Sequence, residues 1–394
     1  MLRQDITISS VADGLHLQLQ LTDFEGNHNK VWIVQYDGET MTTQWGRVGS
    51  RLQQSSRSAT PRYVVSRIHS KLKKGYDIIP HITDTADFIF EATPKIRHFI
   101  KWAYVSAMED ISDYFVGDVG ALSLEHIERA EHLLQEISNT PVNESVSLVQ
   151  DYYRAIPTKL PSKIDALDVT RDFHRNIETQ ESRLRQLRAA RTMSMIDKNK
   201  SVSMTELLGC EVFLPSSKRR EKIVQHIVNS SRGKLQENNI KMVIGLKSDA
   251  RISRYHSLPH INEQPLLYHG TRPPYVLHII RGGLLIAKAS KTGLFGAGLY
   301  FGTESSKSLG YTGTSRGGYS PLFVAQVNMG RVHKAHQKMG SADVDRLLSS
   351  GYDSVWAHKK DKIDGVYRGA LQHDEIVVYN NARVLLTEVV LLKR

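Results

Sequence analysis

The chain has 394 residues, of which 40% are hydrophobic and 24% charged, as in an ordinary soluble globular protein of two or three domains of about 100–200 residues each. Its only cysteine, Cys210, excludes an intrachain disulfide and a multi-cysteine zinc site, so no metal is expected. Since no apolar run approaches the ~18 residues of a membrane span and the N-terminus lacks a signal-peptide pattern, we expect an intracellular protein without a membrane partner.

Residues 1–85 are predicted to be mostly β. Four leucines from Leu15 to Leu21 alternate with polar residues, which is typical of a half-buried strand. Strands are also expected over 31–36 and 40–48, joined by a tight hairpin turn at Asp37-Gly38. Residues 61–74 are then expected to form a helix, because apolar residues recur on one face at four-residue steps.

The net charge is +11, and the basic residues are unevenly distributed along the chain. Between Trp45 and Lys74 there are eight Lys or Arg and no Asp or Glu. Such a cluster can neutralise nucleic-acid phosphates and release their counterions, which favours contact with DNA or RNA over a merely solvated basic face.

Residues 90–200 are predicted to be all α. Ser123 can cap a helix whose apolar face includes Ile127 and Leu134, and a second apolar stripe contains Phe173, Ile177, Leu184 and Leu187. Residues 205–394 change character, because strand-like runs over 322–327, 376–379 and 384–392 alternate with glycine-rich loops and short helices.

A Rossmann dinucleotide site is disfavoured. Gly296-Ala297-Gly298 begins like its fingerprint, but Phe301 stands where the third glycine belongs. A site built from dispersed side chains is the alternative. In it, Gly270 lets the backbone approach a ligand, and Tyr300 and Tyr311 can stack on a flat ring.

Glu375 heads a strand-like apolar run, where a carboxylate is costly unless it is paired or functional. Its structural interpretation is a salt-bridged residue at a strand end. Its functional interpretation is a carboxylate that stabilises a cationic, oxocarbenium-like sugar during glycosyl transfer.

Taken together, these residues resemble the catalytic set of the poly(ADP-ribose) polymerases, which transfer ADP-ribose from NAD+. The members of this set occur in the order His269, Tyr300, Ser308, Tyr311 and Glu375. The resemblance implies that NAD+ is the substrate, that His269 and Thr271 bind its adenosine side, and that Gly270 and Ser308 hold the nicotinamide carboxamide.

By the same resemblance, Tyr311 would stack under the nicotinamide ring and Tyr300 would flank it. Lys307 would lie near Glu375, and Glu375 would be the catalytic residue. Tyr275 and Leu285 stand where many members carry an Asn and an Arg that help to bind adenosine, so this part of the site departs from the family pattern.

The resemblance covers nearly the whole chain and implies a multidomain α+β protein. It predicts a small β-rich WGR domain over residues 1–85, an all-α helical regulatory domain over 90–200 and a mixed α/β ADP-ribosyltransferase domain over 205–394. WGR domains of the family bind DNA ends, and some use the Arg of the motif to contact the helical domain. The predicted DNA-binding residues are Trp45, Arg47, Arg51 and Lys71.

The expected function is that of a DNA-dependent poly(ADP-ribose) polymerase that modifies proteins, including itself, at DNA breaks. It would act in the nucleus if the protein is eukaryotic and in the cytoplasm if it is bacterial or viral. Three alternatives stay open: mono-ADP-ribosylation by the same fold, a DNA-end-binding scaffold with a degenerate transferase, and, least favoured, a dehydrogenase.

Overall fold

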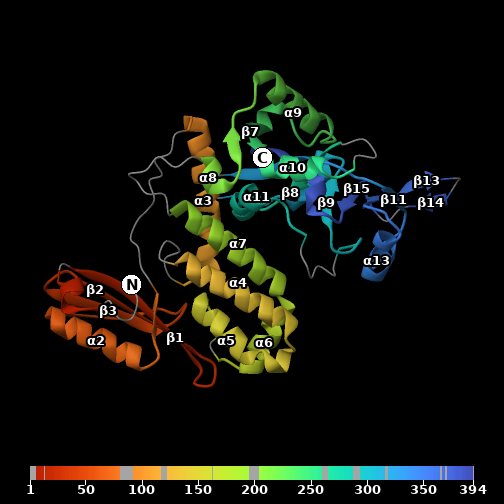
Figure 1. Cartoon of the computed structure of the whole chain (residues 1–394). Coiled ribbons are helices and arrows are strands. Elements are labelled where there is room, and N and C mark those ends of the chain that lie inside the picture. Colours follow the sequence, from red (N-terminus) through yellow and green to blue (C-terminus); the bar gives the residue numbers. More distant parts are fainter. Residues whose placement is uncertain are drawn as a thin grey trace. The chain divides into compact units, whose positions relative to one another are not determined.

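The computed structural model describes residues 6–12, 14–79, 92–116, 122–161, 163–194, 204–259, 265–286, 293–315, 318–363, 366–368 and 371–393 (Figure 1). The chain divides into two compact units, one of Met1–Asp87 with Met108–Met195 and one of Phe88–Ala107 with Ile196–Arg394. The predicted domain limits at residues 85, 90 and 200 lie outside the described residues. Across the described ranges, no helix has both the length and the apolar character needed to cross a bilayer.

The first unit begins with a five-stranded antiparallel sheet in the order β4-β3-β2-β1-β5. Its elements are α1 (Ile8–Val11), β1 (Leu15–Asp23), β2 (His28–Tyr36), β3 (Thr40–Arg47), β4 (Gln53–Ser58), α2 (Pro61–Lys73) and β5 (Asp77–Ile79). The predicted hairpin turn is confirmed, because Gly38 has φ +102° and Asp37 Oδ1 accepts hydrogen bonds from the N–H groups of Glu39 and Thr40.

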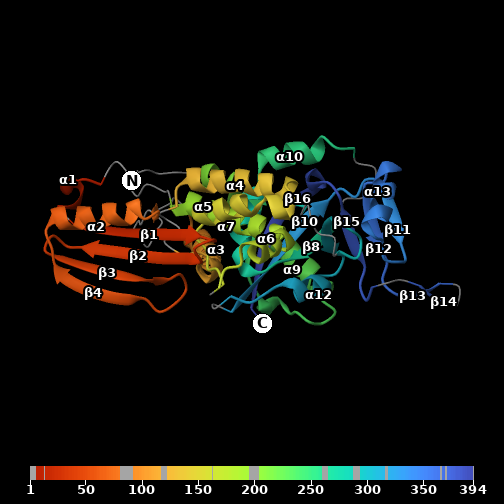
Figure 2. The same ribbon diagram turned by 90° about the horizontal axis from the view of Figure 1, so that it is seen from below.

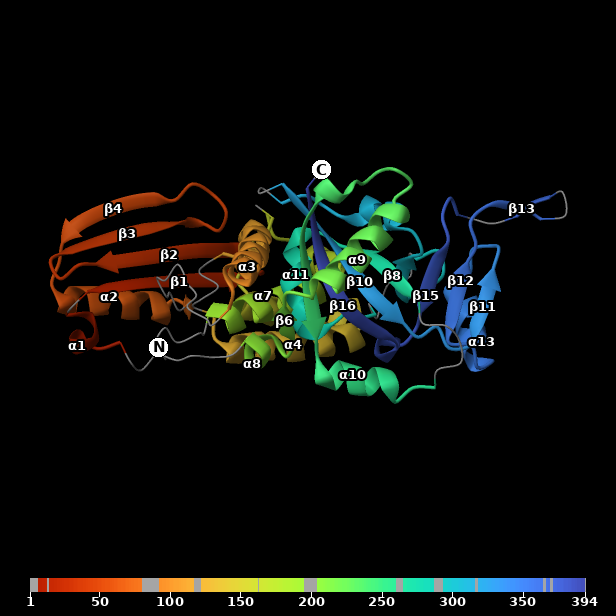
Figure 3. The same cartoon turned by 90° about the horizontal axis from the view of Figure 1, so that it is seen from above.

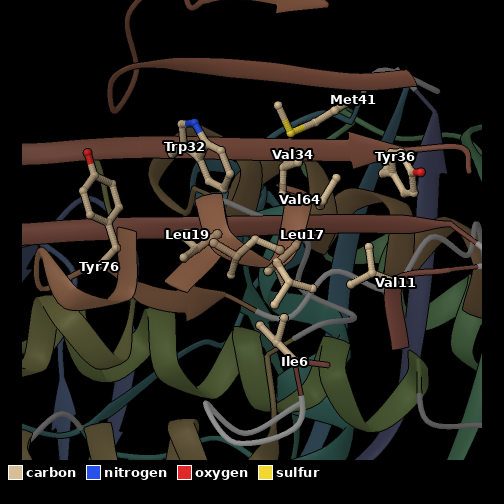
Figure 4. Close-up of a cluster of buried hydrophobic side chains, with 12 residues drawn as sticks. Ile6, Val11, Leu17, Leu19, Trp32, Val34, Tyr36, Met41, Val64 and Tyr76 are labelled. Carbon is tan, nitrogen blue, oxygen red and sulfur yellow. The ribbon is translucent and has the colours of Figure 1, made fainter. Parts of the chain in front are cut away.

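Helix α2 covers one face of this sheet (Figure 2). Thr60 caps it and Pro61 occupies its first position, a combination that sets a helix start. The core between helix and sheet includes Leu19, Trp32, Val34 and Val64, each at most 2% exposed (Figure 4). The alternating leucines of β1 therefore point inward as the period-2 pattern predicts. The expectation of a half-buried strand is wrong, because Gln18 and Gln20 on the opposite face are at most 7% exposed, with Gln18 donating to the Val116 carbonyl.

The rest of this unit is helical. It contains α4 (Leu124–Asn139), η2 (Val142–Glu144), α5 (Val146–Ala155), α6 (Ala166–Arg175) and α7 (Ile177–Ser194), while α3 (Pro94–Tyr114) begins in the second unit and ends in the first. Ser123 caps α4 as predicted, accepting a hydrogen bond from the His126 N–H. The second predicted stripe is divided between two helices, because Asn176 ends α6.

Hydrogen bonds join these helices to the sheet within the first unit. The Phe24 N–H donates to Gln150 Oε1 at 2.8 Å, and Arg154 Nε donates to the Thr22 carbonyl at 3.2 Å. Asn29 Nδ2 donates to the Thr158 carbonyl at 3.2 Å. The structure thus groups the helical region with the sheet, and its separation as a regulatory domain stays a prediction.

The second unit is built on a nine-stranded sheet in the order β11-β12-β15-β9-β8-β10-β16-β7-β6 (Figure 3). The strands are β6 (Glu211–Phe213), β7 (Ile240–Lys247), β8 (Leu266–Gly270), β9 (Leu299–Gly302), β10 (Tyr319–Val327), β11 (Val332–Ala335), β12 (Ser354–Ala357), β15 (Glu375–Val378) and β16 (Val384–Lys393), with β13 (Asp361–Ile363) and β14 (Val366–Arg368) as a separate ribbon. The described helices are α8 (Met204–Leu208), α9 (Ser217–Asn229), η3 (Glu237–Asn239), α10 (Asp249–His256), η4 (Pro273–Tyr275), α11 (Val276–Gly282), α12 (Ser305–Ser308), η5 (Leu309–Tyr311), α13 (Ser341–Ser349) and η6 (Asn381–Arg383). The three strand-like runs predicted in this region are confirmed as β10, β15 and β16.

Candidate active site

Three adjacent strands in the middle of the large sheet place the predicted catalytic residues together. Strand β9 lies between β8 and β15, and Gly302 of β9 pairs with Tyr268 of β8 and with Glu375 of β15. The chain then continues from β9 into α12 and η5, which carry Lys307, Ser308 and Tyr311. Residues more than 100 positions apart thereby meet at one place.

A cavity of about 390 Å³ opens at this point. The described residues that line it are His269, Gly270, Gly293, Leu294, Tyr300, Phe301, Gly302, Lys307, Ser308, Tyr311 and Glu375. Every predicted catalytic or NAD-binding residue belongs to this lining except Thr271, which is buried at 7% exposure. Tyr275 and Leu285 are also outside the described lining, and Leu285 is exposed.

His269 is held in one tautomer. Its Nδ1 lies 3.0 Å from the Tyr300 carbonyl, which can only accept a hydrogen bond, so Nδ1 carries the proton. Burial lowers the pKa of His269, although the same hydrogen bond opposes this shift, and the imidazole is therefore neutral. The other ring nitrogen is left with a lone pair that can accept a hydrogen bond from a ligand hydroxyl.

Gly270 and Ser308 are in close contact across the cavity wall. A Cβ atom on Gly270 would lie 1.9 Å from the Ser308 carbonyl oxygen, so only glycine fits at this position. The Ser308 hydroxyl donates to the Tyr268 carbonyl at 2.9 Å. Its oxygen therefore keeps acceptor capacity, which suits an amide N–H of a ligand.

Two tyrosines differ sharply in their surroundings. The Tyr300 hydroxyl donates to the Gly296 carbonyl at 2.7 Å and accepts from the Phe295 N–H at 3.0 Å, so its ring is fixed, and burial raises its pKa. The Tyr311 side chain is 61% exposed although it lines the cavity. Its ring therefore offers an open apolar face for a flat ligand to stack on.

Glu375 forms a largely buried ion pair. Its Oε1 lies 3.1 Å from Lys307 Nζ, and the two side chains are 8% and 18% exposed. The ammonium group offsets the cost of burying the carboxylate, and it fixes the direction in which the carboxylate points. The salt-bridged and the functional interpretations of Glu375 thus describe the same residue, because the ion pair itself lines the cavity.

The glycine-rich stretch before β9 serves packing. A Cβ on Gly293 would lie 2.3 Å from the Tyr300 hydroxyl, and one on Gly298 would lie 2.5 Å from Val377 Cγ1. Gly298 is followed directly by β9, whereas a Rossmann glycine loop opens a helix. Gly298, one of the two glycines that resemble a nucleotide fingerprint, therefore allows close approach of β15, and Gly293 allows close approach of the Tyr300 hydroxyl.

Sequence reasoning missed a polar cluster at the edge of this site, formed by Glu304, Arg232, His373 and Ser306. Glu304 and Ser306 lie inside the segment that resembles the family motif, but Arg232 and His373 come from distant parts of the chain. A Glu at the start of a short helix was the single local signal.

The predicted DNA-binding residues occupy different environments. Arg47 donates to the Pro161 carbonyl at 2.6 Å and to the Asn27 carbonyl at 3.2 Å, so it connects the sheet to the helical segment of its own unit. Trp45 is partly buried against the core, whereas Arg51 is exposed.

Lys71 is half-buried, with its ammonium 5.4 Å from the Trp32 ring centre and 4.8 Å from that of Tyr76. Burial, followed by repulsion from neighbouring cations, lowers its pKa. Other basic side chains instead line a groove of about 650 Å³ along α2. Its described lining contains no Asp or Glu and consists of Ile8, Arg62, Val65, Ser66, His69, Ser70, Lys73 and Lys74.

Comparison with known proteins accounts for this architecture. Residues 218–393 match the model of the poly(ADP-ribose) polymerase catalytic domain, and residues 15–81 match that of the WGR domain. The chain is 26% identical over 283 residues to poly [ADP-ribose] polymerase tankyrase of Caenorhabditis elegans, covering 62% of this chain and 12% of that protein.

Two further relatives are vertebrate proteins. The chain is 29% identical over 165 residues to protein mono-ADP-ribosyltransferase PARP3 of Mus musculus (40% of this chain, 30% of the relative) and 27% identical over 237 residues to poly [ADP-ribose] polymerase 1 of Danio rerio (55% and 23%). It therefore spans less than a third of the length of each of these three relatives. Residues 15–81 and 218–393 are thus a WGR domain followed by a catalytic domain of the poly(ADP-ribose) polymerase family.

Proposed function

We propose that the chain is a DNA-dependent poly(ADP-ribose) polymerase that transfers ADP-ribose from NAD+ to proteins, including itself. The observation that carries this proposal is the cavity whose lining brings together the neutral His269, the adjoining Gly270 and Ser308, and the Lys307–Glu375 pair. These groups suit the ribose, amide and cationic parts of NAD+ respectively.

In the proposed reaction the bond between ribose C1′ and the nicotinamide nitrogen breaks. Nicotinamide leaves as a neutral molecule with the bonding electron pair, and the ribose becomes oxocarbenium-like. An acceptor oxygen then forms a new bond to C1′, and a hydroxyl acceptor gives up its proton to Glu375 and finally to solvent. Glu375 thus stabilises the cation and orients the acceptor, with Lys307 holding its carboxylate in place.

Polymer formation requires that the acceptor be a hydroxyl of ADP-ribose already attached. A carboxylate beside C1′ can accept the proton of such a hydroxyl, so Glu375 supports elongation. Mono-ADP-ribosylation is the competing outcome, since the relatives include a protein named as a mono-ADP-ribosyltransferase.

The test incubates purified protein with labelled NAD+, with and without duplexes that carry 5′-phosphorylated ends, and resolves the products by size. DNA-stimulated ladders support the proposal, whereas a single product of one unit favours mono-ADP-ribosylation.

DNA is proposed to bind the basic side of the WGR domain. The exposed Arg51 and the groove residues Arg62 and Lys73 are the cations we assign to it, because Arg47 and Lys71 are engaged within their own unit. The groove runs along α2, and its described lining has no acidic side chain, which suits contact with a phosphate backbone.

Removing these cations should weaken DNA binding in a salt-dependent way. For the triple variant Arg51→Gln, Arg62→Gln and Lys73→Gln, the slope of log affinity against log salt should become shallower by about 3, close to one per lost phosphate contact. Fluorescence anisotropy with a labelled duplex across a salt series measures this slope. Arg346→Gln, at an exposed site on α13, is the matched control and should leave it unchanged. An unaltered slope in the triple variant would remove the groove from the DNA surface.

Regulation by the helical region is proposed to act through α3, which begins in the catalytic unit and ends in the first unit. Trp102 of this helix donates to Ser315 Oγ at 3.0 Å and packs edge-on against Tyr319. Ser315 lies four residues after Tyr311. A displacement of α3 would therefore act, through these contacts, directly on the loop that follows Tyr311.

Trp102→Ala should raise DNA-free NAD+ turnover by about 5-fold, because it weakens the contact through which α3 restrains that loop. The DNA-stimulated rate should stay close to that of the wild type. Ser315→Ala serves as a milder variant, since it removes the bonds that Ser315 Oγ accepts from Trp102 and from the Tyr319 N–H and keeps the ring packing. A DNA-free rate that does not rise in either variant would contradict the restraint.

A further inference from the structure

The Glu304 carboxylate contacts three polar side chains, two of which come from outside its own helix. Arg232 binds it with two nitrogens, Nε at 2.5 Å and an Nη at 2.7 Å. His373 Nδ1 lies 3.0 Å from the same carboxylate, and the Ser306 hydroxyl donates to it at 3.2 Å. Glu304 stands at the N-cap of α12, yet its side chain makes no capping hydrogen bond to that helix.

The turn that carries Arg232 also holds α12 through other contacts. The Ser305 hydroxyl donates to the Ile227 carbonyl at 2.7 Å, and the Ser305 N–H donates to Ser230 Oγ at 3.3 Å. Arg232 itself has φ +52°, a left-handed conformation that is uncommon for a residue with a side chain. Such a conformation persists where surrounding contacts fix it, and the bidentate contact of the Arg232 guanidinium with the Glu304 carboxylate is one of them.

Helix α12 needs support from outside because it has only four residues. It carries Lys307, whose Nζ pairs with Glu375 at 3.1 Å, and Ser308, which lines the cavity. His373, at the other end of the cluster, lies two residues before Glu375. Glu304 therefore links the helix that carries the lysine to the strand that carries the catalytic carboxylate.

The residues just before β15 are also held by hydrogen bonds on the side away from α12. Asp374 accepts hydrogen bonds from Trp356 Nε1 at 3.2 Å and from the Lys359 N–H at 2.7 Å. These bonds tie the segment to β12 and the residues after it, whereas the His373–Glu304 bond is the described contact that ties it to α12. Loss of Glu304 thus removes the side-chain connection between α12 and the residues before β15, and only the backbone pairing of Gly302 with Glu375 is left among the described contacts.

We propose that Glu304 is a positioning residue which, by bridging Arg232 and His373, sets the separation between Lys307 and Glu375. This inference rests on the proposed function, in which that pair stabilises the cationic ribose. Glu304 does not line the described cavity, so it acts through Lys307 and Glu375 and not on NAD+ itself.

The test is a double-mutant cycle of Glu304→Gln with Lys307→Ala. With Lys307 present, Glu304→Gln should lower kcat by about 10-fold or more while KM for NAD+ changes by less than about 3-fold, because misplacement of a reacting group affects the chemical step. With Lys307→Ala already made, Glu304→Gln should lower kcat by less than about 2-fold. Equal losses in both backgrounds, or no loss in either, would overturn the proposal.

Two controls keep the result specific. Asp343→Asn removes an exposed carboxylate that pairs with Arg346 on α13 and should leave kcat unchanged. Arg232→Lys keeps the charge but loses the bidentate contact with Glu304, so it should lower kcat in the same pattern as Glu304→Gln. It replaces Glu304→Gln in the cycle if the glutamine variant does not fold.

Crystal structures of the wild type and of Glu304→Gln provide a readout that needs no turnover. The proposal predicts that the distance between Lys307 Nζ and Glu375 Oε1 grows beyond the 3.1 Å of the wild type to more than about 4 Å, past ion-pair range. An unchanged distance would contradict it. If wild-type protein releases no nicotinamide from NAD+, the proposed function fails, and this distance still decides the positioning role.

Discussion

Replacing Glu375 by Gln is expected to lower the kcat of ADP-ribose transfer by about 10²- to 10³-fold and to abolish visible polymer. The amide keeps the shape of the side chain but loses the negative charge that faces the developing ribose cation. It also leaves Lys307 without its carboxylate partner, 3.1 Å away in the wild type. NAD+ affinity, measured by calorimetry, should change by less than about 3-fold, because the amide and ribose contacts are assigned to β8 and Ser308.

The matched control is Glu388→Gln, at another buried carboxylate. Glu388 is 3% exposed and accepts two hydrogen bonds from Arg219, and it lies on β16 outside the described lining of the cavity. Its replacement should reduce the free energy of unfolding by about 1–3 kcal/mol and leave kcat nearly unchanged. Polymer made at the wild-type rate by Glu375→Gln would remove Glu375 from the proposed mechanism.

Gly270→Ala is expected to have the second largest effect, with NAD+ turnover reduced by about 10²-fold. The added methyl group would lie 1.9 Å from the Ser308 carbonyl oxygen, a backbone atom that cannot rotate away. Either β8 or the end of α12 must shift, and both carry groups assigned to the carboxamide of NAD+. The strain should also lower the free energy of unfolding by about 1–3 kcal/mol.

Gly310→Ala tests whether this effect is local. Gly310 lies in η5 beside the same site, but a Cβ there meets nothing within 4 Å. We expect wild-type turnover from it, measured as nicotinamide release. Comparable losses from both alanine variants would show that the close contact at Gly270 has no special role.

The sequence predicts those parts of the fold that follow from local rules. The alternating leucines of β1, the Asp37-Gly38 turn and the Ser123 cap each depend on neighbouring residues, and each is confirmed. Strand β4 was not predicted, because its residues Gln53–Ser58 are polar and exposed throughout. It forms by pairing with β3, and such pairing leaves no hydrophobic period in the sequence.

The candidate site divides in the same way. The motif residues at His269, Tyr300 and Glu375 could be found from their order, and the sheet brings them to one cavity. Their roles remain predictions. The engagement of Arg47 with Pro161 and of Lys71 with Trp32 could not be read from charge alone, because it depends on packing between distant segments. The same holds for Arg232 and His373, which meet Glu304 only in the folded chain.

We propose that the cavity around Glu375 is where the nicotinamide–ribose bond of NAD+ is cleaved and the ADP-ribose transferred. The most direct measurement follows nicotinamide release and protein-bound ADP-ribose together, with purified protein, NAD+ and DNA duplexes carrying 5′-phosphorylated ends. Our account predicts that both products appear in equal amounts and that both disappear in Glu375→Gln. NAD+ that stays intact while the protein binds the DNA tightly would contradict it and favour a DNA-end-binding scaffold.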